Sequence, residues 1–144
     1  LDGGGGLGIP IVDVRVECVD GKTHSVDSSD MAFRTAAAHA LHEAVESAAP
    51  VVLEPIARLE VVVPSENQGD VLGDLGSRRG RIVDSRTDGD RQTIVADVPV
   101  AEIPRYSMEL RSLTAGRGGY TIGEVHHDVL PEHLVSAVVA QYTG

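Results

Sequence analysis

Residues 53–81 read LEPIARLEVVVPSENQGDVLGDLGSRRGR, and this stretch decides the fold. Its first half holds a mostly apolar run at 56–63 that stops at Pro64, which predicts a β-strand. The residues at about 67–76 repeat apolar side chains at helical spacing, which predicts an amphipathic helix. The stretch ends in the Gly-rich turn Ser77-Arg78-Arg79-Gly80-Arg81, the densest positive charge of the chain. A strand, a helix and a tight turn in this order begin an α+β domain.

The residues after this turn continue the alternation of strands and helices. Strand patterns occupy about 80–86, 92–99 and 119–129, and a helical pattern occupies 102–114. Thr87-Asp88-Gly89-Asp90 supplies a hairpin turn, so the predicted order is β-α-β-β-α-β, the ferredoxin-like arrangement. A short amphipathic helix beginning at Pro131 closes the chain. The predicted core comprises Val71, Leu72, Leu75, Ile94, Ala96, Val98, Ile103, Tyr106, Leu110 and Leu113.

The residues before 53 form a second, smaller pattern. Ile11–Cys18 alternates apolar and charged side chains, which predicts a strand with one solvated face. Asp20-Gly21 is a strong turn signal, and His24–Val26 is the predicted returning strand of a hairpin. A helix is predicted from Met31 to Ala48, after several N-cap candidates and before a proline. We therefore expect two domains, at 1–54 and 55–144.

Composition and charge narrow the class of protein. The chain has 144 residues, 42% of them hydrophobic and 3% aromatic, which suffices for a core of Val, Leu, Ile and Ala. Its net charge of −10 argues against a general nucleic-acid binder, although the arginines gather around 78–91. Because arginine suits bidentate phosphate contacts, one interpretation is a local RNA-binding patch, and the other is a solvated basic turn.

Two further features bear on where the protein works. Cys18 is the single cysteine, so no internal disulfide can form, which fits a reducing compartment. No stretch is long and apolar enough to span a bilayer, and no signal-peptide pattern is present. We expect a cytoplasmic protein with no membrane partner.

The sequence predicts neither a catalytic residue nor a metal site. No serine lies in a nucleophile-elbow motif, and the phosphate-loop pattern is absent. Gly116-Arg117-Gly118-Gly119 is Gly-rich but lacks the lysine of that pattern, so it is better interpreted as a tight connection. Pairs such as His39 and Glu43 have neither the number nor the spacing of metal ligands.

The decapeptide at 20–29, DGKTHSVDSS, resembles the tip segment of domain IV of translation elongation factor G. Further matching segments follow in the family's order, nearly without gaps, and together they cover almost the whole chain after the Gly run at 3–6. They are Gly8–Val14, Met31–Phe33, Pro50–Ile56, Gly73–Gly80, Val98–Pro99 and Leu110–Gly118. Glu102–Tyr106 departs from the family's usual Glu-Met-Phe-Gly-Tyr, which indicates an elongation factor G-like paralogue.

The resemblance implies two modules. Residues 1–54 would be the last part of domain IV, a fold with a left-handed βαβ crossover, and 55–144 would be the ferredoxin-like domain V. In the family, the domain IV tip enters the decoding region of the small subunit behind the moving tRNA. Domain V sits at the factor-binding site of the large subunit, near the sarcin–ricin loop and the stalk base. The resemblance thus implies a C-terminal fragment of a ribosomal translocase that contacts rRNA and supports tRNA–mRNA translocation.

The resemblance also implies candidate contact residues. His24 matches a tip residue of the family that contacts RNA, and Lys22 lies in the same tip. Thr23 stands where the family usually has tyrosine, which puts a stacking role at that position in doubt. The arginines expected to contact phosphate are Arg78, Arg79, Arg81 and Arg117.

The GTPase domain of the family is not in this chain, so the resemblance implies no enzymatic activity and no cofactor here. GTP and magnesium would belong to that domain of the parent protein. The opening LDGGGG indicates a chain cut from something longer or joined to it by a linker. Because the first strands of domain IV are missing, we expect the isolated chain to self-associate through residues 9–18 or to leave them mobile.

Two other functions stay open. One is a related ribosomal GTPase, such as a tetracycline-resistance ribosome-protection protein, although the Val-Asp-Ser-Ser context of the tip favours elongation factor G. The other is a stand-alone ferredoxin-like binding module, against which the Ser-Arg-Arg-Gly-Arg turn and His24 both speak. The arginines near the turn either contact RNA or form surface ion pairs. The acids considered as partners are Asp74, Asp84 and Asp88.

Overall fold

The computed structural model describes residues 7–25 and 28–143, which fall into two compact units. One unit is Leu53–Val129, and the other combines the described residues up to Val52 with those from Leu130 onward. The two predicted domains, 1–54 and 55–144, stay a prediction.

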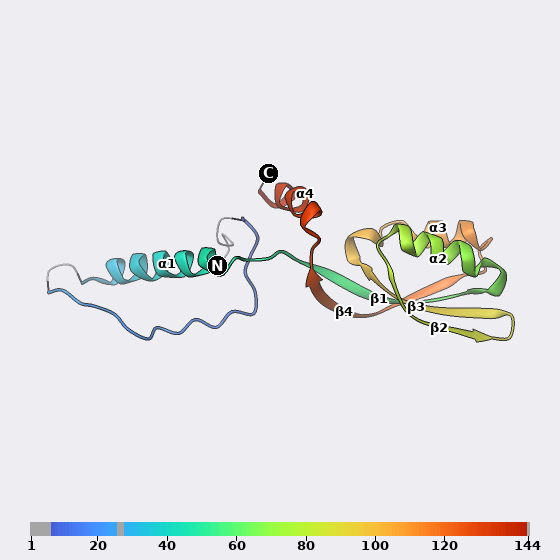
Figure 1. The fold of residues 1–144 in the computed structure, drawn as a ribbon, viewed down its shortest axis with the longest axis horizontal. Helices are drawn as coiled ribbons and strands as arrows, with labels where there is room; N and C mark the ends of the chain where they lie inside the picture. The colour runs from blue at the N-terminus through green and yellow to red at the C-terminus, as the bar shows by residue number, and fades with distance from the viewer. Residues whose placement is uncertain (1–6, 26–27, 144) are drawn as a thin grey trace. The chain divides into compact units, whose positions relative to one another are not determined.

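The unit Leu53–Val129 is a four-stranded antiparallel sheet in the order β2-β3-β1-β4. The strands are β1 (Leu53–Pro64), β2 (Arg81–Asp88), β3 (Arg91–Pro99) and β4 (Gly119–Val129). The helices α2 (Gln68–Ser77) and α3 (Tyr106–Leu113) lie on the same side of the sheet (Figure 1). The short 3-10 turns η2 (Ser65–Asn67) and η3 (Val100–Glu102) precede them. The predicted ferredoxin-like βαββαβ order is therefore confirmed.

The core lies between the sheet and these two helices. Along β1, Leu59, Val61 and Val63 are fully buried, while the residues between them point to the other side. Val61 pairs with Ile94 of β3 and with Tyr120 of β4, so apolar side chains from three strands meet on one face. From the predicted core list, Val71, Leu75, Ile94, Ala96, Val98, Tyr106 and Leu110 are buried, and Leu72, Ile103 and Leu113 are partly buried.

The helix predicted at 102–114 begins later than expected. The structure has a 3-10 turn at Val100–Glu102, and α3 starts only at Tyr106. Arg105 has a left-handed backbone with φ of 68°, which cannot continue a right-handed helix. This left-handed residue separates the 3-10 turn from α3 and delays the helix by about one turn.

In the other unit, α1 (Asp30–Ser47) confirms the predicted helix. Its N-cap is Ser29, whose hydroxyl accepts a hydrogen bond from the Ala32 N–H at 3.2 Å. The apolar face that the sequence predicts includes Phe33, yet no residue of α1 is buried in the described structure. The last element is α4 (Glu132–Thr143). Of the helices in the described ranges, none has the length and apolarity needed to cross a membrane.

The predicted strand at Ile11–Cys18 is wrong for this structure. These residues form no regular element, and Val12, Val14 and Val16 are exposed. A strand needs a neighbour for its backbone N–H and C=O groups, and in the described part of the chain none pairs with this segment. The returning strand is absent at His24 as well, while Val26 lies outside the described residues. Alternation alone therefore does not make a strand.

Candidate nucleic-acid interface

The turn between α2 and β2 is closed by a specific backbone motif. The Gly80 N–H donates to the Leu75 carbonyl at 2.8 Å, and the Arg79 N–H donates to the Gly76 carbonyl at 3.1 Å. These are the two hydrogen bonds of a Schellman C-cap, with Arg79 in the left-handed position at φ of 58°. A Cβ at residue 80 would lie 2.6 Å from the Leu75 carbonyl oxygen, so only glycine fits there. The Arg-Arg-Gly order thus sets where the arginines project.

Arg78 is used inside the protein. Its Nε lies 2.9 Å from the Asp74 carboxylate, and its Nη1 donates to the Glu102 carbonyl at 2.7 Å. The guanidinium also sits over the Tyr106 ring, 5.1 Å from the ring centroid. Only 15% of the side chain is exposed. Arg78 therefore ties the turn to the start of α3 and has little surface for a ligand.

Arg79 is held in a bidentate ion pair. Its two Nη atoms donate to the Glu54 carboxylate at 2.8 and 2.7 Å, and its Nε lies 3.5 Å from a Glu102 carboxylate oxygen. The hydrogen bond to Glu54 is the main reason that the pKa of Arg79 is raised. With 28% of the side chain exposed, Arg79 can reach a ligand only by giving up part of this pairing.

Arg81 is the most accessible arginine of the turn, with 73% of its side chain exposed. Its Nη2 donates to Asp97 at 3.3 Å. The same carboxylate accepts two hydrogen bonds from Arg58, at 2.9 and 3.1 Å. The hydrogen bonds from Arg58 contribute most, and the one from Arg81 contributes less, to holding the pKa of the Asp97 carboxyl below its usual value, so the carboxyl stays ionised. Of the acids considered from the sequence as partners, Asp74 does pair with Arg78, whereas Arg81 pairs with Asp97, and Asp84 pairs with Arg86.

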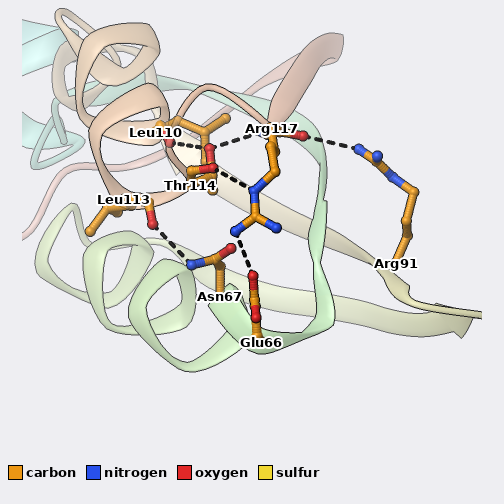
Figure 2. A network of polar contacts seen from close by, with 8 residues as sticks. Glu66, Asn67, Arg91, Leu110, Leu113, Thr114 and Arg117 are labelled. Carbon is orange, nitrogen blue, oxygen red and sulfur yellow. Dashed lines mark hydrogen bonds and ion pairs between the residues drawn. The ribbon is translucent and has the colours of Figure 1, made fainter.

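Arg117 lies in a different polar network, shown in Figure 2. Its Nη2 pairs with Glu66, its Nε donates to the Thr114 carbonyl at 3.3 Å, and its own carbonyl accepts from Arg91 at 3.1 Å. The Thr114 hydroxyl donates to the Leu110 carbonyl at 2.7 Å and accepts the Gly118 N–H at 2.8 Å (Figure 2). This network braces the predicted tight connection at Gly116–Gly119. It also joins the connection to the start of α2, where the Asn67 amide donates to the Leu113 carbonyl at 3.0 Å.

The structure does not bring Arg117 together with the turn arginines. Arg91, which contacts Arg117, pairs across the sheet with Pro64, whereas Arg81 pairs through Asp97 with Arg58. Six residues of extended β1 separate those positions, which corresponds to roughly 20 Å. The predicted arginines therefore occupy two separate regions of this unit.

His24 and Lys22 lie in an exposed loop of the other unit. The Ser28 hydroxyl accepts the His24 N–H at 2.8 Å, and the Ser28 N–H donates to the His24 carbonyl at 3.1 Å. The Gly21 N–H donates to the Asp20 carboxylate at 2.7 Å. Local hydrogen bonds thus hold the described residues of this loop, and both candidate side chains are accessible to solvent.

The candidate residues therefore present positively charged side chains that the surrounding backbone and ion pairs hold in place. Among the described residues, no three His, Cys, Asp or Glu side chains group as metal ligands would. Arg58 and Asp97 are the site residues that sequence reasoning missed. The alternation along β1 and β3 indicates that both side chains lie on the face away from the core. It does not predict that they pair, because the register that places Arg58 opposite Asp97 is set by contacts far apart in the sequence.

Comparisons with known proteins find two family models that match consecutive parts of the chain. The family model described as "Elongation factor G, domain IV" matches residues 2–49, and the one described as "Elongation factor G C-terminus" matches residues 51–138. A crystal structure of a protein from Thermus thermophilus is 44% identical, with a TM-score of 0.72. That match covers 86% of this chain and 19% of the other, so this chain spans about a fifth of that protein's length.

Proposed function

Because the chain belongs to the elongation factor G family, we propose that it supplies the C-terminal ribosome contacts of a translation factor. The observation that carries the proposal is the match of two consecutive family models in the order that the factor has them. The cellular setting of the proposal is the cytoplasm. On this proposal GTP and magnesium bind to a domain outside these residues, and the residues of this chain take no part in a catalytic step.

The unit Leu53–Val129 is proposed to anchor the factor on large-subunit rRNA. Its exposed arginines, led by Arg81, would contact phosphates, and each contact would make the affinity more sensitive to salt. Arg78 and Arg79 contribute in another way, because their ion pairs hold the turn in the shape that projects Arg81. Arg117, which pairs with Glu66, would make a second phosphate contact at a separate place on this unit.

The loop with Lys22 and His24 is proposed to contact the small-subunit decoding region and tRNA. Both side chains are exposed, and the backbone around them is braced by Ser28. A cation and an imidazole presented together suit contacts with phosphate and with unstacked bases. This contact would support tRNA–mRNA translocation by the parent factor.

Chemical footprinting of rRNA in purified ribosomes tests the proposal. The chain should protect large-subunit nucleotides at the sarcin–ricin loop and stalk base, and this protection should weaken with salt. Arg81→Gln should weaken it, whereas Arg111→Gln removes an exposed charge from α3, on the helix-covered side, and should not. In the small subunit, His24→Ala should weaken protection, and His39→Ala, on exposed α1, serves as the matched control.

A folded chain that protects no rRNA at any salt concentration would refute the proposed ribosome contact. Equal losses for Arg81→Gln and Arg111→Gln would show that net charge alone governs binding. In that case the positions of the arginines on the fold would carry no functional meaning.

A further inference from the structure

One face of the sheet in the unit Leu53–Val129 carries no helix (Figure 1). Its β1 side chains are those between the buried positions, namely Arg58, Glu60 and Val62. The β3 residues paired with them are Asp97, Val95 and Thr93. No aromatic ring lies at these central positions to stack on a base, so a nucleic-acid contact here has to rest on charge and hydrogen bonding.

Three charged residues form a row across this face. Asp97 pairs in the sheet register with Arg58 of β1 on one side and with Arg81 of β2 on the other. Its side chain is only 3% exposed, while those of Arg58 and Arg81 are 45% and 73% exposed. A nearly buried carboxylate therefore holds two accessible guanidinium groups side by side.

Both guanidinium groups keep donors for a ligand. Arg58 uses Nε and Nη2 on Asp97, and Arg81 uses Nη2. Among the described residues, nothing accepts a hydrogen bond from Nη1 of Arg58 or from Nε and Nη1 of Arg81. Because one carboxylate compensates only one of the two cations, the row has a net positive charge.

The irregularities of the sheet lie beside the same two arginines. The β1–β4 pairing shifts register between Ala57 and Leu59, which is at Arg58. The β2–β3 pairing shifts register between Ile82 and Asp84, which is at Val83, two residues after Arg81. β-Bulges turn side chains into new directions and are frequent beside functional sites. Their position here supports a role for the row beyond holding the strands together.

The charges around the row favour a small anion held at one point. Glu124 of β4 acts electrostatically on Arg58, and His126 acts on Asp97. Arg86 is paired with Asp84 at 3.0 Å, and Glu60 lies next along β1. These acids oppose loose binding of a polyanion over the whole face. A single phosphate held by the two guanidinium groups faces fewer of these acids than an extended polyanion would, with Glu124 the one that acts on Arg58 itself.

We propose that Arg58, Asp97 and Arg81 form a phosphate-binding fork on the open sheet face, with an RNA backbone phosphate as its ligand. Arg58 and Arg81 donate to the phosphate oxygens, and Asp97 is a positioning residue that sets their spacing. The inference rests on the proposed function and adds to it a contact, Arg58, that the resemblance does not assign.

Fluorescence anisotropy with two probes tests the fork, a synthetic sarcin–ricin hairpin RNA and labelled large ribosomal subunits. Arg58→Gln and Arg81→Gln should each weaken hairpin binding on the order of tenfold, as expected for a lost charge-assisted hydrogen bond. Each should also reduce the salt slope by about 0.7 to 0.9. Arg111→Gln is the control. The near-ultraviolet signal of the packed tyrosines Tyr106 and Tyr120 verifies that each variant is folded.

Asp97→Asn separates positioning from charge. The substitution removes the negative charge that offsets the two arginines, so a purely electrostatic site would bind the hairpin more tightly. The fork instead predicts weaker binding, because asparagine holds the two guanidinium groups less firmly. Tighter binding would overturn the positioning role.

The outcomes of the two probes are distinguishable. Unchanged hairpin affinity in Arg58→Gln and Arg81→Gln, with the unmodified chain binding, overturns the fork and leaves the proposed function standing. A loss confined to whole subunits would mean that the face docks a ribosomal protein, which also overturns a phosphate site. Failure of the unmodified chain to bind either probe would refute the proposed function and the fork together.

Discussion

Replacing Gly80 with alanine perturbs the turn that carries the arginines. The new Cβ would lie 2.6 Å from the Leu75 carbonyl oxygen and 3.2 Å from Cγ2 of Val98. The first contact is with backbone, and the same carbonyl accepts the Gly80 N–H at 2.8 Å. The chain therefore cannot relieve the clash without stretching a hydrogen bond of the Schellman cap.

The expected loss of stability follows from these contacts. Overpacking in a tight site costs typically about 1–3 kcal/mol. Weakening one hydrogen bond adds about 1 kcal/mol, and the lower entropy of the unfolded alanine chain offsets a similar amount. We expect a net loss of about 2 kcal/mol, which for a unit of this size lowers Tm by roughly 10 °C.

Urea and thermal unfolding of the full chain measure this loss. The near-ultraviolet circular dichroism of Tyr106 and Tyr120, whose ring centroids lie 4.9 Å apart, reports mainly on the unit Leu53–Val129. Gly73→Ala is the matched control, because it lies in the middle of α2 with nothing within 4 Å of the added Cβ. That variant should gain about 0.5–1 kcal/mol from helix propensity. If Gly80→Ala were as stable as Gly73→Ala, the steric reasoning would be refuted.

Three further substitutions test other contacts. Thr114→Val should cost about 1–3 kcal/mol in urea unfolding, because it leaves the Gly118 N–H without its acceptor, and Thr114→Ser should retain most of the stability. Tyr106→Phe should be neutral or stabilising by the same measurement, because within the described residues the buried hydroxyl has no hydrogen-bond partner and burial raises its pKa. The lowered pKa of Asp97 means that its stabilising effect is full above about pH 4 and is lost as the pH falls through the folded-state pKa. Unfolding free energies of Asp97→Asn should consequently fall less steeply on acidification than those of the unmodified chain, and parallel curves would contradict this.

Most of the ferredoxin-like unit is predictable from its sequence because its signals are local. Pro64 and the glycines bound the elements, and the spacing of Val71 and Leu75 identifies the buried side of α2. The start of α3 was misplaced because the left-handed backbone of Arg105 depends on how the preceding turn closes. A residue other than glycine in that conformation leaves no sequence signal.

The segment at Ile11–Cys18 marks the limit of periodicity as evidence. Its alternation satisfies the sequence requirement for a strand. Within the described residues, however, its backbone pairs with no other strand, and the segment therefore forms no strand. A helix such as α1 closes its own hydrogen bonds and was predicted correctly, although its apolar side lies exposed. Local pattern specifies a helix by itself, whereas a strand depends on a neighbour.

The sequence by itself determined the order and type of the elements in the unit Leu53–Val129, most of its core and the family. The pairing of Arg78 with Asp74 is local to one helix, but only the tertiary structure decided the long-range partners of the other arginines. Arg79 pairs with Glu54, far earlier in the chain, and Asp97 pairs with both Arg58 and Arg81. The physical reason is that side-chain alternation is set residue by residue, while the register that brings opposite charges together is set by packing across the whole sheet.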